Sequence, residues 1–269
     1  MAFVQKLDAE SLKFFNEVCQ RTFSEQAVFV LNAFYEELKD NLDFIYEVAW
    51  ESIKKVDMDH RNIKYIHLYE EGCDLDFDMA LRLFEVIFKY CEEPKNASYV
   101  SRFPASVPKD LTAITRKKEI RDTVDVNFDG RVSFVEYILY QYNLSPKDLM
   151  DRSTKVEIKN EALEKAMSAL AEVNKKIQEY EAEKARLEEL SQQPGVKGLT
   201  AKNQLAQLHS SPLAETLRRL LITAEAAVRL ASKTAGVPVP GGGAAPRIDG
   251  QVWWLNKEVE TKKKKYGAK

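Results

Sequence analysis

The sequence predicts an all-α protein. Apolar residues recur at helical spacing near the N-terminus, an acidic loop with helical flanks follows, and a heptad pattern begins near residue 157. Such periodicities indicate helices that each bury one face. We expect five consecutive parts: an N-terminal helical bundle (1–56), a pair of helix–loop–helix hands (57–150), a long helical hairpin (151–235), a Pro/Gly linker (236–252) and a Trp/Lys basic tail (253–269).

Residues 9–56 show the pattern of three helices. Their apolar positions are Phe14, Phe15, Val18 and Cys19 in the first helix, Val28, Val30, Leu31, Phe34 and Tyr35 in the second, and Phe44, Ile45, Val48, Ala49 and Ile53 in the third. Ser24 is the expected N-cap of the second helix, because a serine hydroxyl accepts a hydrogen bond from a free helical N–H. The many aromatic residues favour a packed bundle core.

Residues 125–136 match the EF-hand calcium-loop pattern D-x-[DN]-x-[DN]-G-x5-E at every specified position. Calcium takes about six to eight oxygen ligands, and this spacing aims several oxygens at one point. The predicted ligands are the side chains of Asp125, Asn127 and Asp129, the backbone carbonyl of Arg131, Ser133 directly or through water, and both carboxylate oxygens of Glu136. Gly130 permits the sharp turn in the loop.

Helical segments are expected on both sides of this loop, so the calcium-binding hand covers residues 110–145. The entering helix should span Asp110 to Val124, with Leu111, Ile114, Ile120 and Val124 on its apolar side. The exiting helix should begin at Phe134. Val132 is expected to form a short β contact with a partner loop.

A degenerate hand is expected at residues 61–91. In the favoured register, Leu75–Leu81 mirrors Val132–Ile138, and Met79 then replaces the bidentate glutamate, so no metal binds. A rival register remains open, with Asp74, Asp76 and Asp78 at loop positions 1, 3 and 5 and Glu85 at position 12. That register has Met79 where the turn needs glycine.

The hairpin is predicted from a heptad seam typical of coiled coils. The seam consists of Leu163, Ala166, Leu170, Val173, Ile177 and Tyr180. This seam is short for a two-chain coiled coil, so the simpler interpretation is a long helix packed on a later helix of the same chain. Residues 192–199 should break the first helix, and Ser211 should cap the second before Pro212.

Gly236–Gly250 is expected to be a flexible linker, because it lacks the Lys-Ser/Thr and the preceding strand of a phosphate-binding loop. The tail that follows joins Trp253 and Trp254 to four consecutive lysines at 262–265. Two interpretations stay open. This segment is either a binding anchor with flanking charge or a solvated tail whose tryptophans pack back on the protein.

Composition narrows the function classes. The net charge of −2 divides into about −8 for residues 1–150 and +6 for residues 151–269, which suggests a basic end that faces an acidic partner. The odd count of 3 cysteines predicts reduced thiols and a cytoplasmic protein. We expect no signal peptide, because Asp8 and Glu10 follow Met1–Leu7 at once, and no membrane span.

Several longer stretches together carry a family resemblance. They are DLDFDMAL (74–81), VDVNFDGRVSFVEYILYQY (124–142), AEVNKKI (171–177), YEAEKARL (180–187), PGVKGL (194–199), AEAAVRLASK (224–233) and WWLNKEVETKKKKYG (253–267). Over nearly its whole length the chain resembles the calcium-regulated actin-bundling proteins of amoeboid protists. The short N-terminus and the abbreviated linker depart from the family pattern, but neither touches the calcium loop.

The resemblance implies a monomeric cross-linker of actin filaments, located on the cytoskeleton of the cell cortex or protrusions, whose bundling is reduced when Ca²⁺ binds. A cross-linker needs two filament-binding surfaces, and filaments are acidic, so basic positions are the candidates. These are Arg218, Arg219, Arg229 and Lys233 in the hairpin and Trp253, Trp254, Lys262, Lys263, Lys264 and Lys265 in the tail.

The rival functions are weaker. An enzyme is not expected, because no nucleophile elbow, P-loop, dinucleotide fingerprint or metal-hydrolase spacing occurs. Nucleic-acid binding is not expected from one short lysine run without a recognisable fold. The alternative that stays open is an EF-hand sensor or adaptor that binds a non-actin protein. Against it, only one loop is complete and only 5 methionines are present.

Overall fold

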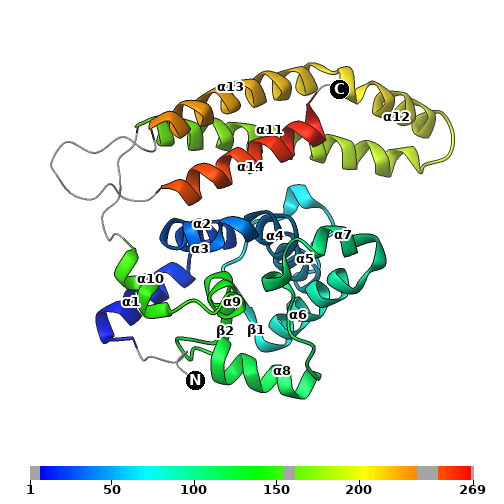
Figure 1. Ribbon diagram of the computed structural model, residues 1–269. Coiled ribbons are helices and arrows are strands. Elements are labelled where there is room, and N and C mark those ends of the chain that lie inside the picture. The colour runs from blue at the N-terminus through cyan, green and yellow to red at the C-terminus, as the bar shows by residue number, and fades with distance from the viewer. Residues whose placement is uncertain (1–6, 154–160, 235–247, 268–269) are drawn as a thin grey trace. The chain divides into compact units, whose positions relative to one another are not determined.

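The computed structural model describes residues 7–153, 161–234 and 248–267 (Figure 1). These residues are mainly helical, with one short two-stranded sheet, which confirms the predicted all-α class. The chain divides into two compact units that are described separately. Unit 1 comprises Met1–Asn62, Glu70–Val156 and Asp249–Gln251, and unit 2 comprises Ile63–Tyr69, Glu157–Ile248 and Val252–Lys269.

The described residues of unit 1 form ten α-helices and two π-helical segments. The π-helical segments are η2 (Ile45–Trp50) and η6 (Ile120–Val124). The α-helices are α1 (Ala9–Cys19), α2 (Phe23–Ala33), α3 (Tyr35–Leu38), α4 (Leu42–Phe44), α5 (Glu51–His60), α6 (Phe77–Glu92), α7 (Ala97–Val100), α8 (Ala113–Glu119), α9 (Phe134–Gln141) and α10 (Pro146–Arg152). The predicted third helix is therefore divided among α4, η2 and α5.

The N-cap residue of the second helix, α2, differs from the predicted one. Its N-cap is Thr22, whose hydroxyl accepts from the Glu25 N–H at 3.4 Å, while the Glu25 carboxylate accepts from the Thr22 N–H at 2.9 Å. This reciprocal pair satisfies two free N–H groups at the helix end. The prediction of Ser24 as N-cap was wrong, because Ser24 lies within the helix and donates to Glu71 instead.

Aromatic residues form much of the core of unit 1. Phe15, Phe23, Phe44 and Phe134 are each fully buried, and the rings of Phe23 and Phe134 meet edge to face with centroids 6.5 Å apart. Burial of each such side chain contributes about 1.5–3 kcal/mol. Because Phe134 opens α9, this core fixes the helix that leaves the candidate calcium loop.

A two-stranded antiparallel sheet joins the two hands of unit 1. Strand β1 (Asp74–Asp76) pairs with β2 (Arg131–Ser133), with Leu75 opposite Val132. Both of these central residues are buried. The pairing confirms the expected β contact of Val132. It also sets the first hand in the favoured register, in which Met79 takes the place of Glu136.

Unit 2 is built from long helices. They are α11 (Glu161–Ser191), α12 (Val196–Gln207), α13 (Pro212–Thr234) and α14 (Asp249–Tyr266), whose first three residues belong to unit 1. The seam residues Leu163, Ala166, Leu170, Val173 and Tyr180 are buried against residues of α13 and α14, and Ile177 is half-buried beside them. Helix α11 therefore packs on a later helix of the same chain, as predicted.

Details of unit 2 sharpen the sequence predictions. The Ser211 hydroxyl accepts from the Ala214 N–H at 3.2 Å and caps α13. The expected break at residues 192–199 is shorter, because α12 begins at Val196. The residues expected as a basic tail form most of α14, and Val252, Leu255 and Val259 join the core of unit 2. Residues 236–247 of the expected linker lie outside the described residues.

Candidate calcium site and basic surfaces

The candidate calcium loop, Asp125–Glu136, lies between two helical segments. Helix α8 continues into η6, whose last residue precedes Asp125, and α9 begins at Phe134. Gly130 has a φ of +81°, in the left-handed region that a glycine adopts without strain. The entering helix starts at Ala113 rather than Asp110, and Ile114, predicted on its apolar side, is 84% exposed. That part of the prediction was wrong.

Hydrogen bonds wrap the first half of the loop around Asp125. One Asp125 oxygen accepts from the Asp129 N–H at 3.2 Å and the other from the Gly130 N–H at 3.0 Å. The Asp129 carboxylate accepts from the Arg131 N–H at 2.8 Å. Asn127 Oδ1 accepts from the Asp129 N–H at 3.3 Å. The side chains at loop positions 1, 3 and 5 therefore fold inward together.

Glu136 closes the loop from the other side. Its Oε1 accepts from the Val126 N–H at 2.8 Å, and its Oε2 accepts from the N–H and the hydroxyl of Ser133, both at 2.8 Å. Glu136 is only 1% exposed, and burial raises its pKa to about 7. The charge of Asp125 raises this pKa further. Positions 1, 2, 9 and 12 of the loop are thus held around one small region.

These residues fit a calcium ion. Burial raises the pKa of Asp125, and the nearby carboxylate of Asp129 adds to the increase, so the loop gathers like charges that a cation would neutralise. All the candidate donors are oxygens, the ligands that calcium prefers. Within the described residues, no three His, Cys, Asp or Glu side chains form a metal cluster. The donor set here also draws on the Asn127 amide, the Ser133 hydroxyl and a backbone carbonyl.

The first hand offers no comparable donor set. Asp74 and Asp76 lie in strand β1, and Asp76 caps α6 by accepting from the Met79 N–H at 2.8 Å. Asp78 and Glu85 lie in α6 and pair with Lys117 and Arg82 respectively. The strand pairing is incompatible with the rival register, in which residues 74–78 would form the first half of a loop.

The guanidinium of Arg131 has a role that the loop pattern does not reveal. Its Nε donates to the Asp74 carboxylate at 2.6 Å, and its Nη2 contacts the same oxygen. The residue that should ligate calcium through its backbone therefore neutralises an acidic residue of the first hand through its side chain. Sequence reasoning assigned no role to this charge, because the partner becomes visible only through the strand register.

The basic candidates on α13 differ in exposure. Arg219 and Lys233 are exposed, and Arg229 is 72% exposed although it pairs with Glu225 at 2.9 Å. Arg218 is half-buried and donates to the His209 carbonyl at 2.7 Å. Ile222 is 64% exposed on the same helix, which places an apolar side chain among exposed cations. Arg218 therefore contributes to structure, while the other three basic residues form the exposed basic face of α13.

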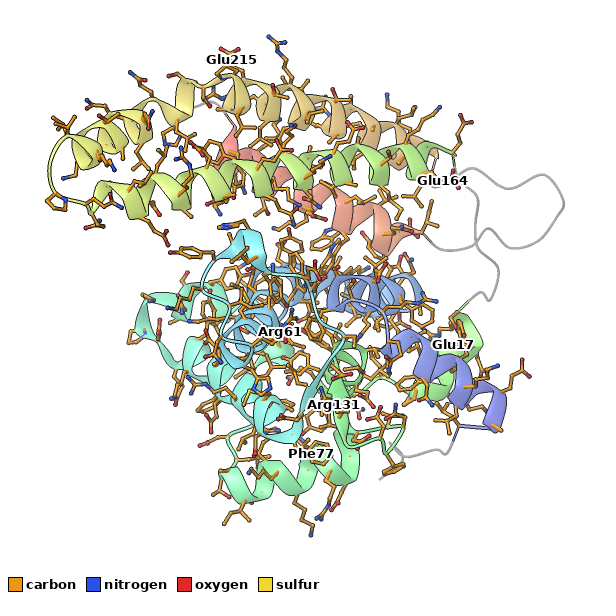
Figure 2. The ribbon with its side chains drawn as sticks, turned by 180° about the vertical axis from the view of Figure 1, so that it is seen from behind. Glu17, Arg61, Phe77, Arg131, Glu164 and Glu215 are labelled. Carbon is orange, nitrogen blue, oxygen red and sulfur yellow. The ribbon has the colours of Figure 1, made fainter. Side chains whose placement is uncertain are left out.

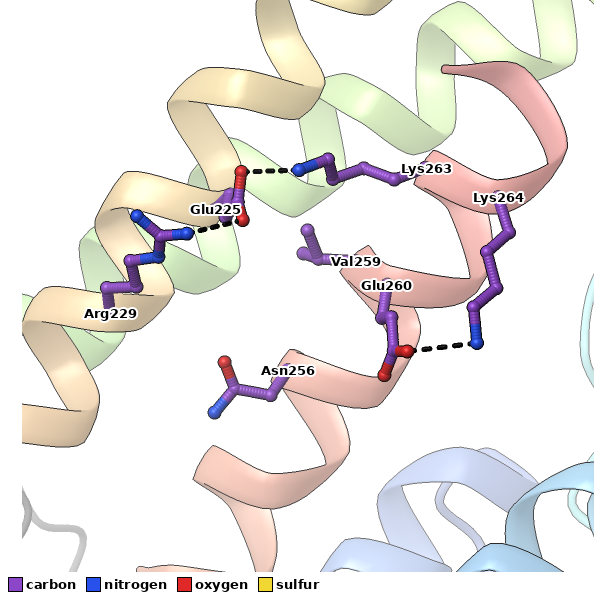
Figure 3. Close-up of a pocket in the computed structure, with 7 residues that line it drawn as sticks. All are labelled: Glu225, Arg229, Asn256, Val259, Glu260, Lys263 and Lys264. Carbon is purple, nitrogen blue, oxygen red and sulfur yellow. Dashed lines mark hydrogen bonds and ion pairs between the residues drawn. The ribbon is translucent and has the colours of Figure 1, made fainter. Parts of the chain in front are cut away.

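The tail lysines all pair with glutamates of unit 2. Figure 3 shows Lys263 and Glu225, 2.6 Å apart, and Lys264 and Glu260, 2.9 Å apart. Lys265 lies 3.4 Å from Glu181, and Lys262 contacts Glu258. Lys263 and Lys265 link α14 to α13 and α11, whereas Lys262 and Lys264 pair within α14. Because exposed ion pairs contribute only about 0–1 kcal/mol, the exposed members, Lys264 and Lys265, can still meet an acidic partner.

The tryptophans of α14 do not form an exposed anchor. Trp254 is 2% exposed and Trp253 is half-buried. Of the two open interpretations of this segment, the structure favours tryptophans that pack back on the protein. The segment is nevertheless helical, which the lysine run did not indicate.

None of the described helices is both long enough and apolar enough to cross a membrane. The protein is of the all-α class. It has two helical hands joined by a short sheet, one of them with an oxygen-rich loop, and a separate unit of long amphipathic helices. Residues 131–245 match the family model described as F actin bundling C terminal. The match starts inside the candidate calcium loop and extends beyond α13.

Two comparisons cover almost the whole chain. It is 50% identical over 272 residues to the calcium-regulated actin-bundling protein of Dictyostelium discoideum, with 99% of this chain and 92% of that protein covered. The crystal structure of the 34 kDa F-actin bundling protein from Dictyostelium discoideum matches with a TM-score of 0.90, 50% identity, and coverage of 98% of this chain and 99% of that chain.

The chain belongs to this family of F-actin bundling proteins, as its identity and coverage show. The family resemblance inferred from the sequence is confirmed. Both relatives are described as bundling proteins, and the chain is accordingly a structural protein rather than an enzyme.

Proposed function

We propose that this chain is a monomeric cross-linker of actin filaments and that calcium bound to Asp125–Glu136 reduces its bundling activity. The observation that supports the proposal most is the oxygen-rich loop, in which Asp125, Ser133 and Glu136 are buried, in a chain 50% identical to a calcium-regulated actin-bundling protein. The proposal also places the protein in the cytoplasm, on the actin cytoskeleton of the cell cortex or protrusions.

Six residues would hold the ion, namely Asp125, Asn127, Asp129 and Ser133 by side-chain oxygens, Arg131 by its carbonyl and Glu136 by its carboxylate. The bound ion would neutralise the carboxylates that repel one another in this loop. Glu136 now caps α9 through Ser133 and reaches Val126 at the start of the loop. A change in its contacts would therefore act on the first turn of α9 and on the start of the loop.

The exiting helix is the route by which such a change leaves the loop. Helix α9 ends at Gln141, and the chain continues through α10 towards α11 of unit 2. Glu136 is the third residue of α9, so its reorientation changes the first turn of that helix. A shift of about 1–3 kcal/mol in a two-state equilibrium changes filament affinity by roughly 5–150-fold.

The exposed basic face of α13 is the proposed filament contact of unit 2. Arg219, Arg229 and Lys233 would steer encounter with the acidic filament, and Ile222 would supply apolar contact area. Lys264 and Lys265 of α14 are the remaining exposed candidates from the predicted set. Unit 1 would provide the second surface that a monomeric cross-linker needs.

Co-sedimentation with filamentous actin tests this function. At low centrifugal speed only bundles sediment, and at high speed all bound protein sediments with the filaments. We expect the chain to bundle filaments without calcium and to bundle fewer with calcium. A chain that binds calcium but never sediments with filaments would instead support a sensor or adaptor for another protein.

A further inference from the structure

Helix α1 lies outside both hands yet reaches the candidate calcium loop. Asn127 Nδ2 donates to Asn16 Oδ1 at 2.9 Å, although 111 residues separate the two positions in the sequence. A second contact joins the same helix to the loop, because the Ser133 hydroxyl lies 3.4 Å from Cys19 Sγ. Figure 2 labels Glu17, the neighbour of Asn16 on α1, and Arg131 of the loop. Two predicted ligand residues, at loop positions 3 and 9, thus touch one helix.

The hydrogen bond to Asn16 bears on the orientation of the side-chain amide of Asn127. An asparagine can bind calcium only through its oxygen, because its NH₂ group carries two donor hydrogens and repels a cation. Asn127 Oδ1 accepts from the backbone N–H of Asp129 at 3.3 Å, and Nδ2 donates to Asp129 Oδ2 at 2.9 Å and to Asn16. A reversed amide would place a donor against the Asp129 N–H and an oxygen against the Asn16 oxygen.

We propose that Asn16 is a positioning residue of the calcium site, which orients Asn127 so that its oxygen faces the ion. The inference rests on the proposed calcium-binding function of this loop. Residues that hydrogen-bond to metal ligands fix the direction of those ligands, and their loss typically weakens metal binding about 10–100-fold. Calcium affinity then depends on helix α1, a part of the chain that the loop pattern does not include.

Asn16 suits a mutational test, because replacement of its side chain should leave the fold intact. Asn16 is exposed, whereas its helix is anchored by Phe15, Val18 and Cys19, which are all buried. Substitution of an exposed residue away from special features usually changes stability by less than about 0.5 kcal/mol. Gln20, another exposed amide at the end of the same helix, provides a matched control.

The experiment measures calcium binding to the full chain by isothermal titration calorimetry, with far-ultraviolet circular dichroism to monitor folding. We expect Asn16→Leu to weaken calcium binding about tenfold, towards the lower end of the effect usual for such residues because Asn16 is exposed. The variant Gln20→Leu should bind like the parent. Asn16→Asp should restore most of the affinity, because its carboxylate accepts the same hydrogen bond.

The possible outcomes separate this inference from the proposed function. Calcium binding by Asn16→Leu within about twofold of the parent would overturn the role of Asn16 while the calcium site itself stands. If Asn16→Leu loses helical structure, Asn16→Ala takes its place with the same expected result. A parent chain that binds no calcium would overturn both proposals. Equal weakening in Asn16→Leu and Asn16→Asp would show that the contact does not act through hydrogen-bond acceptance.

Discussion

The loop between α8 and α9 and the segment between α5 and α6 meet at the same two-stranded sheet, but they hold that sheet in different ways. In the second hand, six residues, Asp125–Gly130, precede β2, and the side chains of Asp125, Asn127 and Asp129 fold inward. In the first hand, Arg61–Cys73 precede β1, and part of this longer segment belongs to unit 2. No liganding glutamate follows, because Met79 occupies that position.

The first hand replaces an ion with side-chain contacts. The Glu71 carboxylate accepts from Trp50 Nε1 and from the Ser24 hydroxyl, both at 2.5 Å. Arg61 pairs with Asp57 at 3.0 Å. Together with the contact between Arg131 and Asp74, these bonds hold the first hand by side chains alone. Because these side-chain contacts need no ion, we expect the first hand to change less than the second hand when calcium binds.

The largest expected effect follows from a matched pair of substitutions. Glu136→Gln removes the negative charge and one strong donor oxygen of position 12, and we expect calcium affinity to fall by more than about 100-fold, beyond the effect of losing a supporting residue. Glu85→Gln makes the same change at position 12 of the excluded register and should leave calcium binding unchanged. Calorimetry measures both. Two tight sites in the parent, with one surviving Glu136→Gln, would revive the register that uses Glu85.

Substitution of Gln26 tests whether a buried side chain couples the two hands by hydrogen bonds. This fully buried side chain donates to the Cys73 carbonyl of the first hand at 2.6 Å and accepts from the Val135 N–H of the second at 3.0 Å. Gln26→Leu leaves buried partners unsatisfied, and we expect the free energy of unfolding to fall by about 3 kcal/mol. Urea denaturation measures this loss, with Gln20→Leu as the exposed control. An equal, small loss of unfolding free energy in both variants would show that Gln26 does not couple the two hands.

The pH dependence of stability should differ with and without calcium. Burial raises the pKa of Glu136 from an ordinary 4.5 to about 7, so the calcium-free folded state holds its proton more tightly than the unfolded state. This contribution to stability is fully present below about pH 4.5 and is lost as the pH rises through about 7. Calcium should therefore raise the melting temperature more at pH 7.5 than at pH 5. A calcium effect independent of pH would contradict this.

The smallest expected effect comes from restoring the missing glutamate of the first hand. Met79→Glu supplies a carboxylate at the position equivalent to Glu136, but Asp74 remains paired with Arg131 and no oxygen-rich loop precedes it. We expect the calcium stoichiometry of the variant to remain one per chain. A second binding event in calorimetry would show that the first hand lacks only this one ligand.

Much of this arrangement could be predicted from local sequence patterns. The spacing of Asp125, Asn127, Asp129 and Glu136 identified the second loop, and the likeness of Leu75 and Val132 predicted the sheet contact and its register. The sheet contact is confirmed, and it could be predicted because the two hands repeat the same local pattern around each strand. The calcium ligands stay a prediction. Heptad spacing predicted the seam of α11 for the same reason.

Several of the contacts that the sequence did not reveal are long-range. Asn16, Gln26 and the guanidinium of Arg131 act on partners 47 to 111 residues away, and no periodicity marks them. The helical conformation of the tail was not predicted, because a run of lysines hides the apolar spacing of Val252, Leu255 and Val259. Ile114 was placed on an apolar face although α8 turns it to solvent.

The most direct test of the account measures bundling by the Glu136→Gln variant in low-speed co-sedimentation with filamentous actin across a calcium titration, beside the parent and Glu85→Gln. The filament contacts proposed on α13 are unchanged in all three chains, so each should bundle equally without calcium. Calcium should reduce bundling by the parent and by Glu85→Gln, while Glu136→Gln should keep bundling at the same calcium concentration. Full inhibition of Glu136→Gln by calcium would place the sensor outside Asp125–Glu136 and contradict the account.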